Sequence, residues 1–290
     1  MVVRRRLDVE LVRRGLLSSR EMAQRAIDER RVLVGGALAE RSARQVDAAE
    51  PIELVGPRPR FVGRGGEKLD AALERFAIDV SGYTVLDAGA STGGFTDCVL
   101  QRGASSVVAV DVGHQQLHER LRADCRVEVH ERTNVRTWSA DALGGRRFDL
   151  VVADLSFISL TAVAVPLTCR AVGPLVVLIK PQFEAGRAEA SRGRGVIRSR
   201  ESWEASLGRV QAAFACPGAA MIGLMVSPIT GAEGNVEFLA HFSMVGEVVL
   251  GKLAILASPA DVEMPRTERF DAMIQFALDE AARVGTGGHG

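Results

Sequence analysis

The stretch from Tyr83 to Thr96 constrains the fold more than any other part of the chain. A short apolar run ends at an acid, Asp87, a loop of small residues follows, and an apolar-periodic segment begins at Phe95. This order predicts a strand, a tight glycine turn and a helix, which together form the first unit of a parallel α/β sheet. Glycines let the backbone pass close to a ligand, and the helix start presents free N–H groups.

The spacing of the glycines in this turn separates two classes of cofactor. A dinucleotide site is typical of G-x-G-x-x-G, whereas this turn has G-x-x-x-G-G, a pattern that matches the loop that holds S-adenosylmethionine. The alternative is an ordinary doubly wound fold with a glycine-rich first turn. The residues that we expect to bind the cofactor here are Asp87, Gly89, Ala90, Ser91, Thr92, Gly93 and Gly94.

The composition is that of a globular protein, with 47% apolar and 25% charged residues in 290. The four cysteines are far apart and form no C-x-x-C pair, so we expect neither a metal site nor a disulfide framework. The basic N-terminus is followed by no apolar signal segment. No apolar stretch approaches the roughly 20 residues that span a bilayer. We therefore expect a cytoplasmic protein with no membrane association.

The net charge is zero, but its distribution is uneven. Residues 1–64 contain 14 arginines against nine acidic residues, and the rest of the chain has the matching acidic excess. A basic module joined to an acidic one indicates either a nucleic-acid-binding module or a solvated charged surface.

The basic module has a compact predicted architecture. Helical spacing predicts a helix over 7–16, a capping-box pattern opens a second helix over 18–28, and residues 31–38 predict a hairpin that turns at Gly35–Gly36. A short strand is expected over 53–55. The arginines of the helical part, whose guanidinium groups suit phosphate contacts, are Arg4, Arg5, Arg6, Arg13, Arg14, Arg20 and Arg25.

This module resembles the RNA-binding domain first seen in ribosomal protein S-four. The resemblance rests on the R-L-D opening, the helix–turn–helix–hairpin order and a loose body pattern anchored at Ser19, Arg20, Ala26 or Ile27, Val32, Val34 and Gly36. It implies binding to structured RNA, and such RNA is read mostly by shape and phosphate contacts. We place this domain at 1–58 and a turn-rich linker at 59–66.

The remainder predicts a Rossmann-like, seven-stranded, doubly wound α/β sheet over 67–242. Strands and helical patterns alternate, and the last two strands have only a loop between them, which favours a terminal antiparallel hairpin. The predicted strands are 85–87, 106–111, 126–129, 149–154, 174–180, 221–227 and 237–242, and the predicted helices are 67–76, 94–102, 116–122, 159–171 and 201–214. Residues 243–290 form an extension, with an amphipathic helix over 265–284 and a disordered tail.

Polar residues at strand ends complete the expected cofactor site, because ligands in such sheets bind at the carboxyl ends of the strands. Asp111 ends the second strand and is expected to accept hydrogen bonds from ribose hydroxyls, with Val112 beside it. Asn134 and Val135 follow the third strand and could line an adenine pocket. The alternatives are a helix N-cap for Asp111 and an ordinary turn for the pair that follows the third strand.

Four charged residues carry the expected chemistry. Asp154 and Lys180 end two apolar strands, Glu237 begins the last strand, and Lys68 lies at a helix start outside the sheet. Their order and strand positions resemble the ribose 2′-O-methyltransferases of the FtsJ-like group. A lysine could take the proton of a ribose hydroxyl or orient its lone pair toward a methyl group. We take Lys180 as the central group, Asp154 as its partner, and the other two as residues that position the ribose.

Over roughly residues 4–242 the chain resembles the TlyA family, whose members are named both as hemolysins and as ribosomal RNA 2′-O-methyltransferases. The matching stretches are V-x-R-G-G-x-K-L (62–69), D-A-G-A-S-T-G-G-F-T-D (87–97), V-D-V-G (110–113), D-L-S-F-I-S-L (154–160), I-K-P-Q-F-E-A-G-R (179–187) and G-N-V-E-F (234–238). The resemblance implies methylation of a cytidine ribose in ribosomal RNA with S-adenosylmethionine as donor. It also implies phosphate contacts from Arg64 and an arginine-rich loop with Arg187, Arg192, Arg194, Arg198 and Arg200.

The chain departs from the family pattern at two places. Gly63 stands where a serine is expected, and Arg60-Phe61-Val62 replaces the R-x-W-V linker of some relatives.

Two other functions stay open at this point, a non-catalytic RNA-binding or ribosome-assembly factor and a membrane-active hemolysin. No strongly amphipathic membrane segment favours the second.

Overall fold

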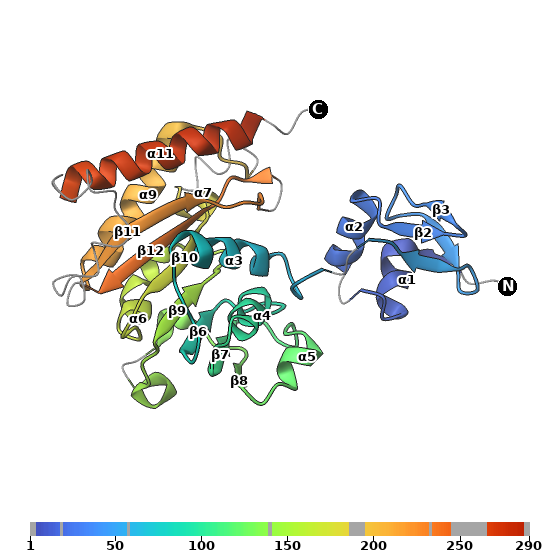
Figure 1. The fold of residues 1–290 in the computed structure, drawn as a ribbon, viewed down its shortest axis with the longest axis horizontal. Coiled ribbons are helices and arrows are strands. Elements are labelled where there is room, and N and C mark those ends of the chain that lie inside the picture. The colour runs from blue at the N-terminus through green and yellow to red at the C-terminus, as the bar shows by residue number, and fades with distance from the viewer. Residues whose placement is uncertain are drawn as a thin grey trace. The chain divides into compact units, whose positions relative to one another are not determined.

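The computed structural model describes residues 4–17, 20–56, 59–138, 141–185, 195–231, 234–244 and 266–286. The chain divides into two compact units, Met1–Gly63 and Arg64–Gly290. Each unit has a hydrophobic core of its own, and each is described by itself (Figure 1).

The N-terminal unit packs two helices against short strands. Its elements are β1 (Arg4–Arg6), α1 (Leu7–Arg13), α2 (Arg20–Asp28), β2 (Val32–Val34), β3 (Ala37–Leu38), β4 (Gln45–Asp47) and β5 (Ile52–Leu54). Leu7 and Leu11 of α1 and Ile27 of α2 are buried in its core, as their helical spacing predicts. The hairpin is also confirmed, because Gly35 and Gly36 both have positive φ and join β2 to β3.

Two strands of this unit were not predicted. β1 pairs antiparallel with β4, so that Arg5 lies opposite Val46. Each strand has only three residues, and an arginine triplet carries no strand periodicity. The pairing joins segments that are 40 residues apart in the sequence, so it is decided by the tertiary fold.

The C-terminal unit contains the predicted seven-stranded sheet, with the order β11-β12-β10-β9-β6-β7-β8. β12 runs antiparallel to both of its neighbours, whereas the other pairs are parallel, which confirms the expected terminal hairpin. The strands are β6 (Thr84–Ala88), β7 (Ser106–Val110), β8 (Val127–His130), β9 (Leu150–Ala153), β10 (Leu175–Ile179), β11 (Ala219–Val226) and β12 (Phe238–Met244).

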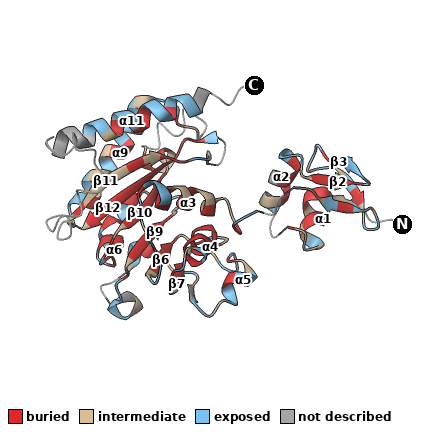
Figure 2. Ribbon diagram, in the orientation of Figure 1, coloured by how far each residue is buried: buried red, intermediate tan, exposed pale blue. Residues whose placement is uncertain are grey.

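Helices cover both faces of this sheet, and Figure 2 shows the central strands buried between them. α3 packs beside α4 and against β12. α9 and α11 pack against β11 and against each other, and α6 and α7 pack against α9. The helices are α3 (Gly65–Arg75), α4 (Gly94–Gln101), α5 (Glu119–Arg122), α6 (Ala164–Thr168), α7 (Pro181–Glu184), α9 (Arg200–Ala215) and α11 (Arg266–Thr286). Burial on both faces explains why β9 and β10 are continuous apolar runs.

Three helix predictions need correction. The helix expected over 159–171 is broken into a 3₁₀ turn, Leu160–Ala162, and α6, because Pro166 has no N–H to continue the first segment. The helix expected over 116–122 is shortened to the four residues of α5. α11 continues to Thr286, past the expected start of the disordered tail, whereas 287–290 lie outside the described residues.

Candidate active site

Strand register brings three of the four predicted catalytic residues to the carboxyl end of β10. Val177 of β10 lies opposite Ala153 of β9, so Asp154 emerges one residue later on the neighbouring strand. Ile179 lies opposite Phe238 of β12. Because the two strands are antiparallel, Lys180, which follows Ile179, is a neighbour of Glu237, which precedes Phe238. Because the last strand is antiparallel, Glu237 at its start lies at the same edge of the sheet as the carboxyl ends of the parallel strands.

Lys180 is held by two side chains from the loop that follows β9. Its Nζ lies 2.6 Å from Asp154 Oδ1 and donates a hydrogen bond to Ser156 Oγ at 2.8 Å. The Phe183 ring centroid lies 5.9 Å from the same Nζ. An ammonium or amine group has three hydrogen or lone-pair directions, so two are directed within the protein and the third is available to a substrate.

Lys68 and Glu237 form a second lysine–carboxylate pair. The Nζ of Lys68 donates to Glu237 Oε2 at 2.5 Å, and both side chains are almost completely buried. Gly231 packs against the Glu237 carboxylate, where any side chain would collide with it. Gly65, one turn before Lys68 on α3, faces Asp154, because a Cβ at Gly65 would lie 3.6 Å from Asp154 Oδ2. The two pairs therefore belong to one cluster.

The predicted glycine turn lies against this cluster. Gly89 has φ of 88°, and a Cβ there would collide with the carbonyl oxygen of Asp154. Gly93 has φ of 98° and lies just before α4, whose first residue is Gly94, and a Cβ at Gly93 would collide with Leu121. Both positions exclude side chains for conformational and steric reasons. The N-cap residue of α4 is Gly93, which has no side chain to cap the first turn of the helix.

Asp87 is completely buried within β6. Its Oδ2 accepts a hydrogen bond from Thr96 Oγ1 at 2.6 Å, whereas Oδ1 is buried without a hydrogen-bond partner in the described structure. Burial, helped by the nearby charges of Asp154 and Asp111 and opposed by hydrogen bonds from Thr96, raises the pKa of this carboxyl to about 7. An orphaned buried carboxylate oxygen beside a glycine turn fits a site for a cationic or hydroxyl-bearing group.

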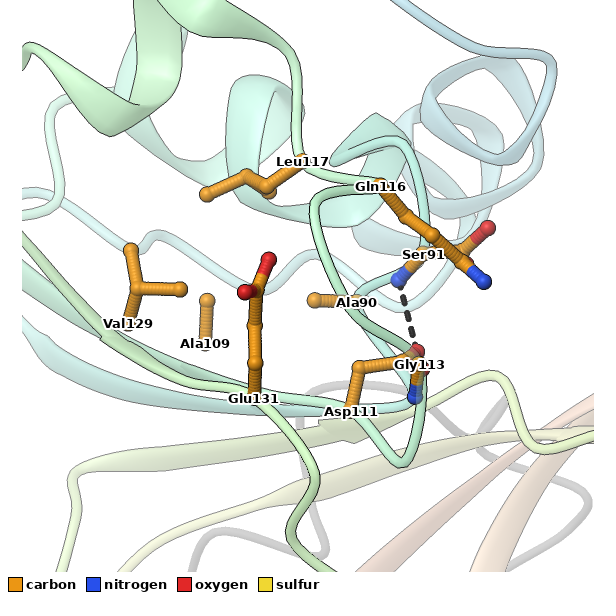
Figure 3. Close-up of a pocket in the computed structure, with 9 residues that line it drawn as sticks. All are labelled: Ala90, Ser91, Ala109, Asp111, Gly113, Gln116, Leu117, Val129 and Glu131. Carbon is orange, nitrogen blue, oxygen red and sulfur yellow. Dashed lines mark hydrogen bonds between the residues drawn. The ribbon is translucent and has the colours of Figure 1, made fainter.

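Asp111 pins the glycine turn to the end of β7. Its two carboxylate oxygens accept backbone N–H groups from Ser91 at 2.9 Å and from Gly113 at 2.6 Å. Figure 3 shows the small hollow that these residues line together with Ala90 and Glu131. A carboxylate has further lone pairs, so Asp111 retains the capacity to accept ribose hydroxyls. Its role as the acceptor of ribose hydroxyls stays a prediction.

Four other predicted cofactor residues, Thr92, Val112, Asn134 and Val135, do not line this hollow. Val112 is 68% exposed beside Asp111, and the Thr92 carbonyl accepts a hydrogen bond from the backbone of His118. The Asn134 side chain accepts from Arg136 N and caps a 3₁₀ turn, Val135–Thr137. Val135 is buried in the sheet core, so its side chain contributes to packing.

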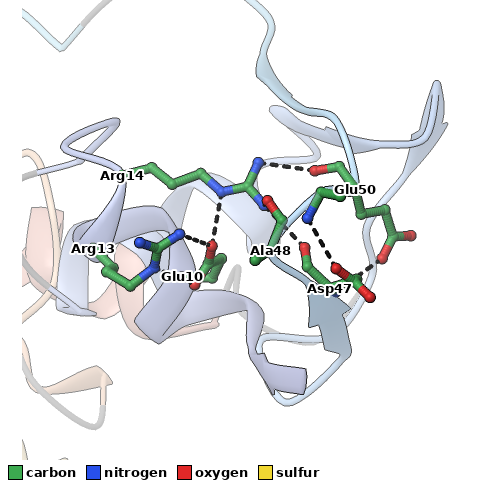
Figure 4. Close-up of polar contacts among 7 residues, drawn as sticks. Glu10, Arg13, Arg14, Asp47, Ala48 and Glu50 are labelled. Carbon is green, nitrogen blue, oxygen red and sulfur yellow. Dashed lines mark hydrogen bonds and ion pairs between the residues drawn. The ribbon is translucent and has the colours of Figure 1, made fainter. Parts of the chain in front are cut away.

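The predicted RNA-binding arginines fall into different environments. Arg14 donates to the carboxylate of Glu10 and to the carbonyl oxygens of Asp47, Ala48 and Glu50, so its guanidinium joins α1 to β4 (Figure 4). Arg13 also pairs with Glu10. The guanidinium of Arg13 holds the pKa of Glu10 below its usual range, with desolvation opposing. Arg14 therefore has a structural role that its sequence position did not indicate.

A second buried acid organises the other end of the same helix. Asp8 accepts from Arg6 and from Arg20, and both guanidiniums lie 3.0 Å from its carboxylate. Arg4 and Arg5 lie on β1 at the surface of the unit. The Arg25 side chain lies outside the described part of the structure, and so do Arg187, Arg192 and Arg194.

The remaining predicted arginines lie in the C-terminal unit. Arg64 lies directly before α3, at its N-cap position. Arg198 is exposed before α9, whereas Arg200 pairs with Asp279 and donates to Gln275 of α11.

Sequence reasoning missed two residues of the cluster and one general signal. Ser156 contacts Lys180 directly, and Phe157 is 93% exposed with φ of 64°, a conformation that is costly for an aromatic residue. The signal is the lysine count, because only three of the 36 basic residues are lysines and two of these lie in the cluster. Arginine cannot release a proton near neutral pH, whereas lysine can, so selective use of lysine here indicates a chemical requirement.

Two further features were sought in the described residues. No group of three or more potential metal ligands occurs among them. None of the described helices is long and apolar enough to cross a membrane.

Known proteins resemble this chain over most of its length. The chain is 46% identical over 241 residues to the 16S/23S rRNA (cytidine-2′-O)-methyltransferase TlyA of Mycobacterium tuberculosis, which covers 82% of this chain and 89% of that protein. It is 40% identical over 240 residues to hemolysin A of Brachyspira hyodysenteriae, covering 82% and 99%. The solved structure of a candidate hemolysin from Streptococcus thermophilus has 33% identity and a TM-score of 0.72 and covers 99% of this chain and 98% of that one.

Two family models match separate parts of the chain. The model for an S4 domain matches residues 5–52, and the model for an FtsJ-like methyltransferase matches residues 61–244. Because the second match covers more than half of the chain, and the relatives agree over most of its length, the chain belongs to the FtsJ-like methyltransferase family, within its TlyA branch, and carries an S4 domain near its N-terminus.

Proposed function

We propose that this protein methylates the 2′-hydroxyl of a cytidine ribose in ribosomal RNA, with S-adenosylmethionine as the methyl donor. The observation that carries the proposal is the pair of lysine–carboxylate contacts, Lys180 with Asp154 and Lys68 with Glu237, beside the glycine turn. The names of the relatives support the substrate, because the Mycobacterium tuberculosis TlyA protein is named as an rRNA cytidine-2′-O-methyltransferase.

The residues around the glycine turn suit this cofactor. Asp111 would accept the ribose hydroxyls, and the unpartnered Oδ1 of Asp87 would face the cationic end of the molecule. Val112, exposed beside Asp111, would offer an apolar surface to the adenine. When bound, S-adenosylmethionine supplies an electrophilic methyl group on a sulfonium centre.

Lys180 would act on the target hydroxyl. Asp154 and Ser156 occupy two of the directions around its Nζ, so the third would meet the ribose 2′-oxygen. In its neutral form the amine would accept the hydroxyl proton there, and Asp154 would stabilise the ammonium that forms. Much of the rate gain would come from alignment of the hydroxyl oxygen with the methyl group.

Lys68 and Glu237 would fix the wall of the site. Their mutual hydrogen bond is buried, so each charge is compensated and the pair is rigid. The Glu237 carboxylate would accept a hydrogen bond from the substrate ribose, which would place its 2′-oxygen next to Lys180.

The N-terminal unit would bring the RNA to this site. Arg4, Arg5 and Arg20 present guanidinium groups at the surface of a domain that matches the S4 model, and phosphate contacts of this kind position RNA. Phe157, exposed next to Ser156, would offer its ring to an unstacked base.

Methyl transfer from labelled S-adenosylmethionine to ribosomal subunits tests the proposal, with mass spectrometry to locate a 2′-O-methylcytidine. Lys180→Ala and Lys180→Arg should both lower kcat by about 100-fold or more, because neither replacement can accept the proton. The matched control is Arg75→Ala, which removes an exposed positive charge at the far end of α3 and should retain activity. Full activity in Lys180→Arg would overturn the proton-transfer role, and an inactive wild type would overturn the function.

A further inference from the structure

The loop between β9 and the following 3₁₀ turn carries Ser156 and Phe157, and its two apolar residues, Leu155 and Ile158, pack partly buried against the sheet core. Among the described residues, 155–158 take part in no backbone–backbone hydrogen bond, and Phe157 adopts the left-handed conformation at φ of 64°. Phe157 is 93% exposed, and its ring lies 5.3 Å, centroid to centroid, from the ring of Phe183. A strained backbone conformation such as that of Phe157 persists only where the surrounding structure fixes it, so the two ends of the loop matter.

One end of this loop is fixed by the active-site pair. Asp154 N donates to the Ala88 carbonyl at 3.0 Å, and the Asp154 carboxylate meets Lys180. The strand and the lysine therefore hold the first residue of the loop.

The other end is fixed by Glu184, a buried acid that the proposed chemistry does not use. Its Oε1 accepts a hydrogen bond from Leu160 N at 2.8 Å, and its Oε2 accepts one from Ser159 Oγ at 2.5 Å. Glu184 is the last residue of α7, the short helix that follows Lys180 directly. The carboxylate therefore ties the exit of the loop to the segment that carries the central lysine.

The environment of Glu184 shows that these contacts are not incidental. Only 8% of the residue is exposed. Desolvation raises the pKa of its carboxyl, while the hydrogen bonds from Ser159 and Leu160 and the charge of Arg209 oppose that rise. Arg209 of α9 also donates to the Glu184 carbonyl at 3.0 Å, so the backbone of α7 is held as well.

We propose that Glu184 is a positioning residue for RNA, which holds the loop 154–159 so that Phe157 meets the target nucleotide. The proposal rests on the function proposed above and deepens it, because it assigns the exposed aromatic ring to the substrate and the buried carboxylate to the support of that ring. Glu184 touches neither RNA nor cofactor in this arrangement.

The test is a double-mutant cycle between Glu184 and Phe157, measured on kcat/KM for RNA, on RNA affinity and on S-adenosylmethionine affinity. Glu184→Ala should lower kcat/KM for RNA by about tenfold and leave cofactor affinity within about twofold. In the Phe157→Ala background the same substitution should have little further effect, because the side chain that it positions is gone. Glu184→Gln should retain most activity, since its amide oxygen accepts from Leu160 and the Ser159 hydroxyl can rotate.

Asp149→Ala is the matched control. Asp149 also accepts one backbone N–H and one hydroxyl, both from Thr84 at 2.8 Å, but it lies just before β9, at the opposite end of that strand from Asp154. The Asp149→Ala substitution should reduce the stability of the protein, and its effect on kcat/KM for RNA should be the same with and without the Phe157 side chain. Equal effects of Glu184→Ala in both Phe157 backgrounds, or no effect at all, would overturn the inference. An inactive wild type would refute methylation, and the cycle on RNA affinity would still decide the role of Glu184.

Discussion

Replacing Asp87 by asparagine should stabilise the protein at alkaline pH and weaken its binding of S-adenosylmethionine. The carboxyl group is completely buried, and its only hydrogen-bond donor from a side chain is Thr96. Burial raises the pKa of Asp87 from 3.8 to about 7. Asparagine has nearly the same shape and can keep the contact with Thr96, but it carries no charge that burial would penalise.

The magnitude follows from the linkage between proton binding and folding. Between pH 3.8 and about 7 the folded protein binds more protons at Asp87 than the unfolded chain does, so stability falls as the pH rises through this window. At about 1.4 kcal/mol for each pKa unit, the total cost above pH 7 is about 4 kcal/mol, and about 2–3 kcal/mol of it arises between pH 5 and pH 8. The asparagine variant lacks this term, although its amide leaves a buried donor unpaired at a cost of about 1–3 kcal/mol.

The assay is chemical denaturation of the wild type and of Asp87→Asn at pH 5 and pH 8 without cofactor. The stability of the variant relative to the wild type should increase by about 2–3 kcal/mol from the lower to the higher pH. Calorimetric titration with S-adenosylmethionine at pH 8 should show weaker binding, because the unpartnered carboxylate oxygen is lost. A difference between the two proteins that stays constant with pH would refute the buried-charge reasoning, and unchanged cofactor affinity would remove Asp87 from the binding site.

Three further perturbations test other parts of the structure. Desolvation lowers the pKa of His241 from 6.5 to about 4, so between these pH values the unfolded chain binds a proton that the folded protein does not, and the folded protein loses stability as the pH falls. Denaturation curves of His241→Leu should therefore show a loss of stability between pH 7 and pH 5 that is about 2 kcal/mol smaller than that of the wild type. Phe157→Ala should leave the melting temperature unchanged and weaken RNA binding by roughly 1–3 kcal/mol in filter-binding assays, whereas Phe276→Ala, the exposed control on α11, should do neither. Arg14→Ala should lower the melting temperature, whereas Arg5→Ala should leave it unchanged and reduce the salt dependence of RNA binding by about one unit of slope.

The sequence by itself determined the seven strands of the large sheet in their chain order and placed three of the catalytic candidates at strand ends. Apolar runs that end in Asp154 and Lys180 can only be buried parallel strands whose last residues emerge at one edge, and the structure confirms those strands. The glycines of the first turn are also local requirements, because Gly89 and Gly93 both have positive φ. Hydrophobic periodicity and turn chemistry depend on only a few neighbouring residues, so they can be predicted from the sequence without knowledge of the fold.

The tertiary structure decided which charges meet. The pairing of Lys68 with Glu237 joins residues that are 169 positions apart, and the assignment of Arg14 to internal contacts depends on carbonyl oxygens more than 30 residues away. The short helices around Pro166 and the exposed, strained ring of Phe157 depend likewise on packing and on loop ends held by distant groups. Long-range contacts leave no periodic trace in the sequence, because each is set by strand order and register, which a linear pattern does not contain.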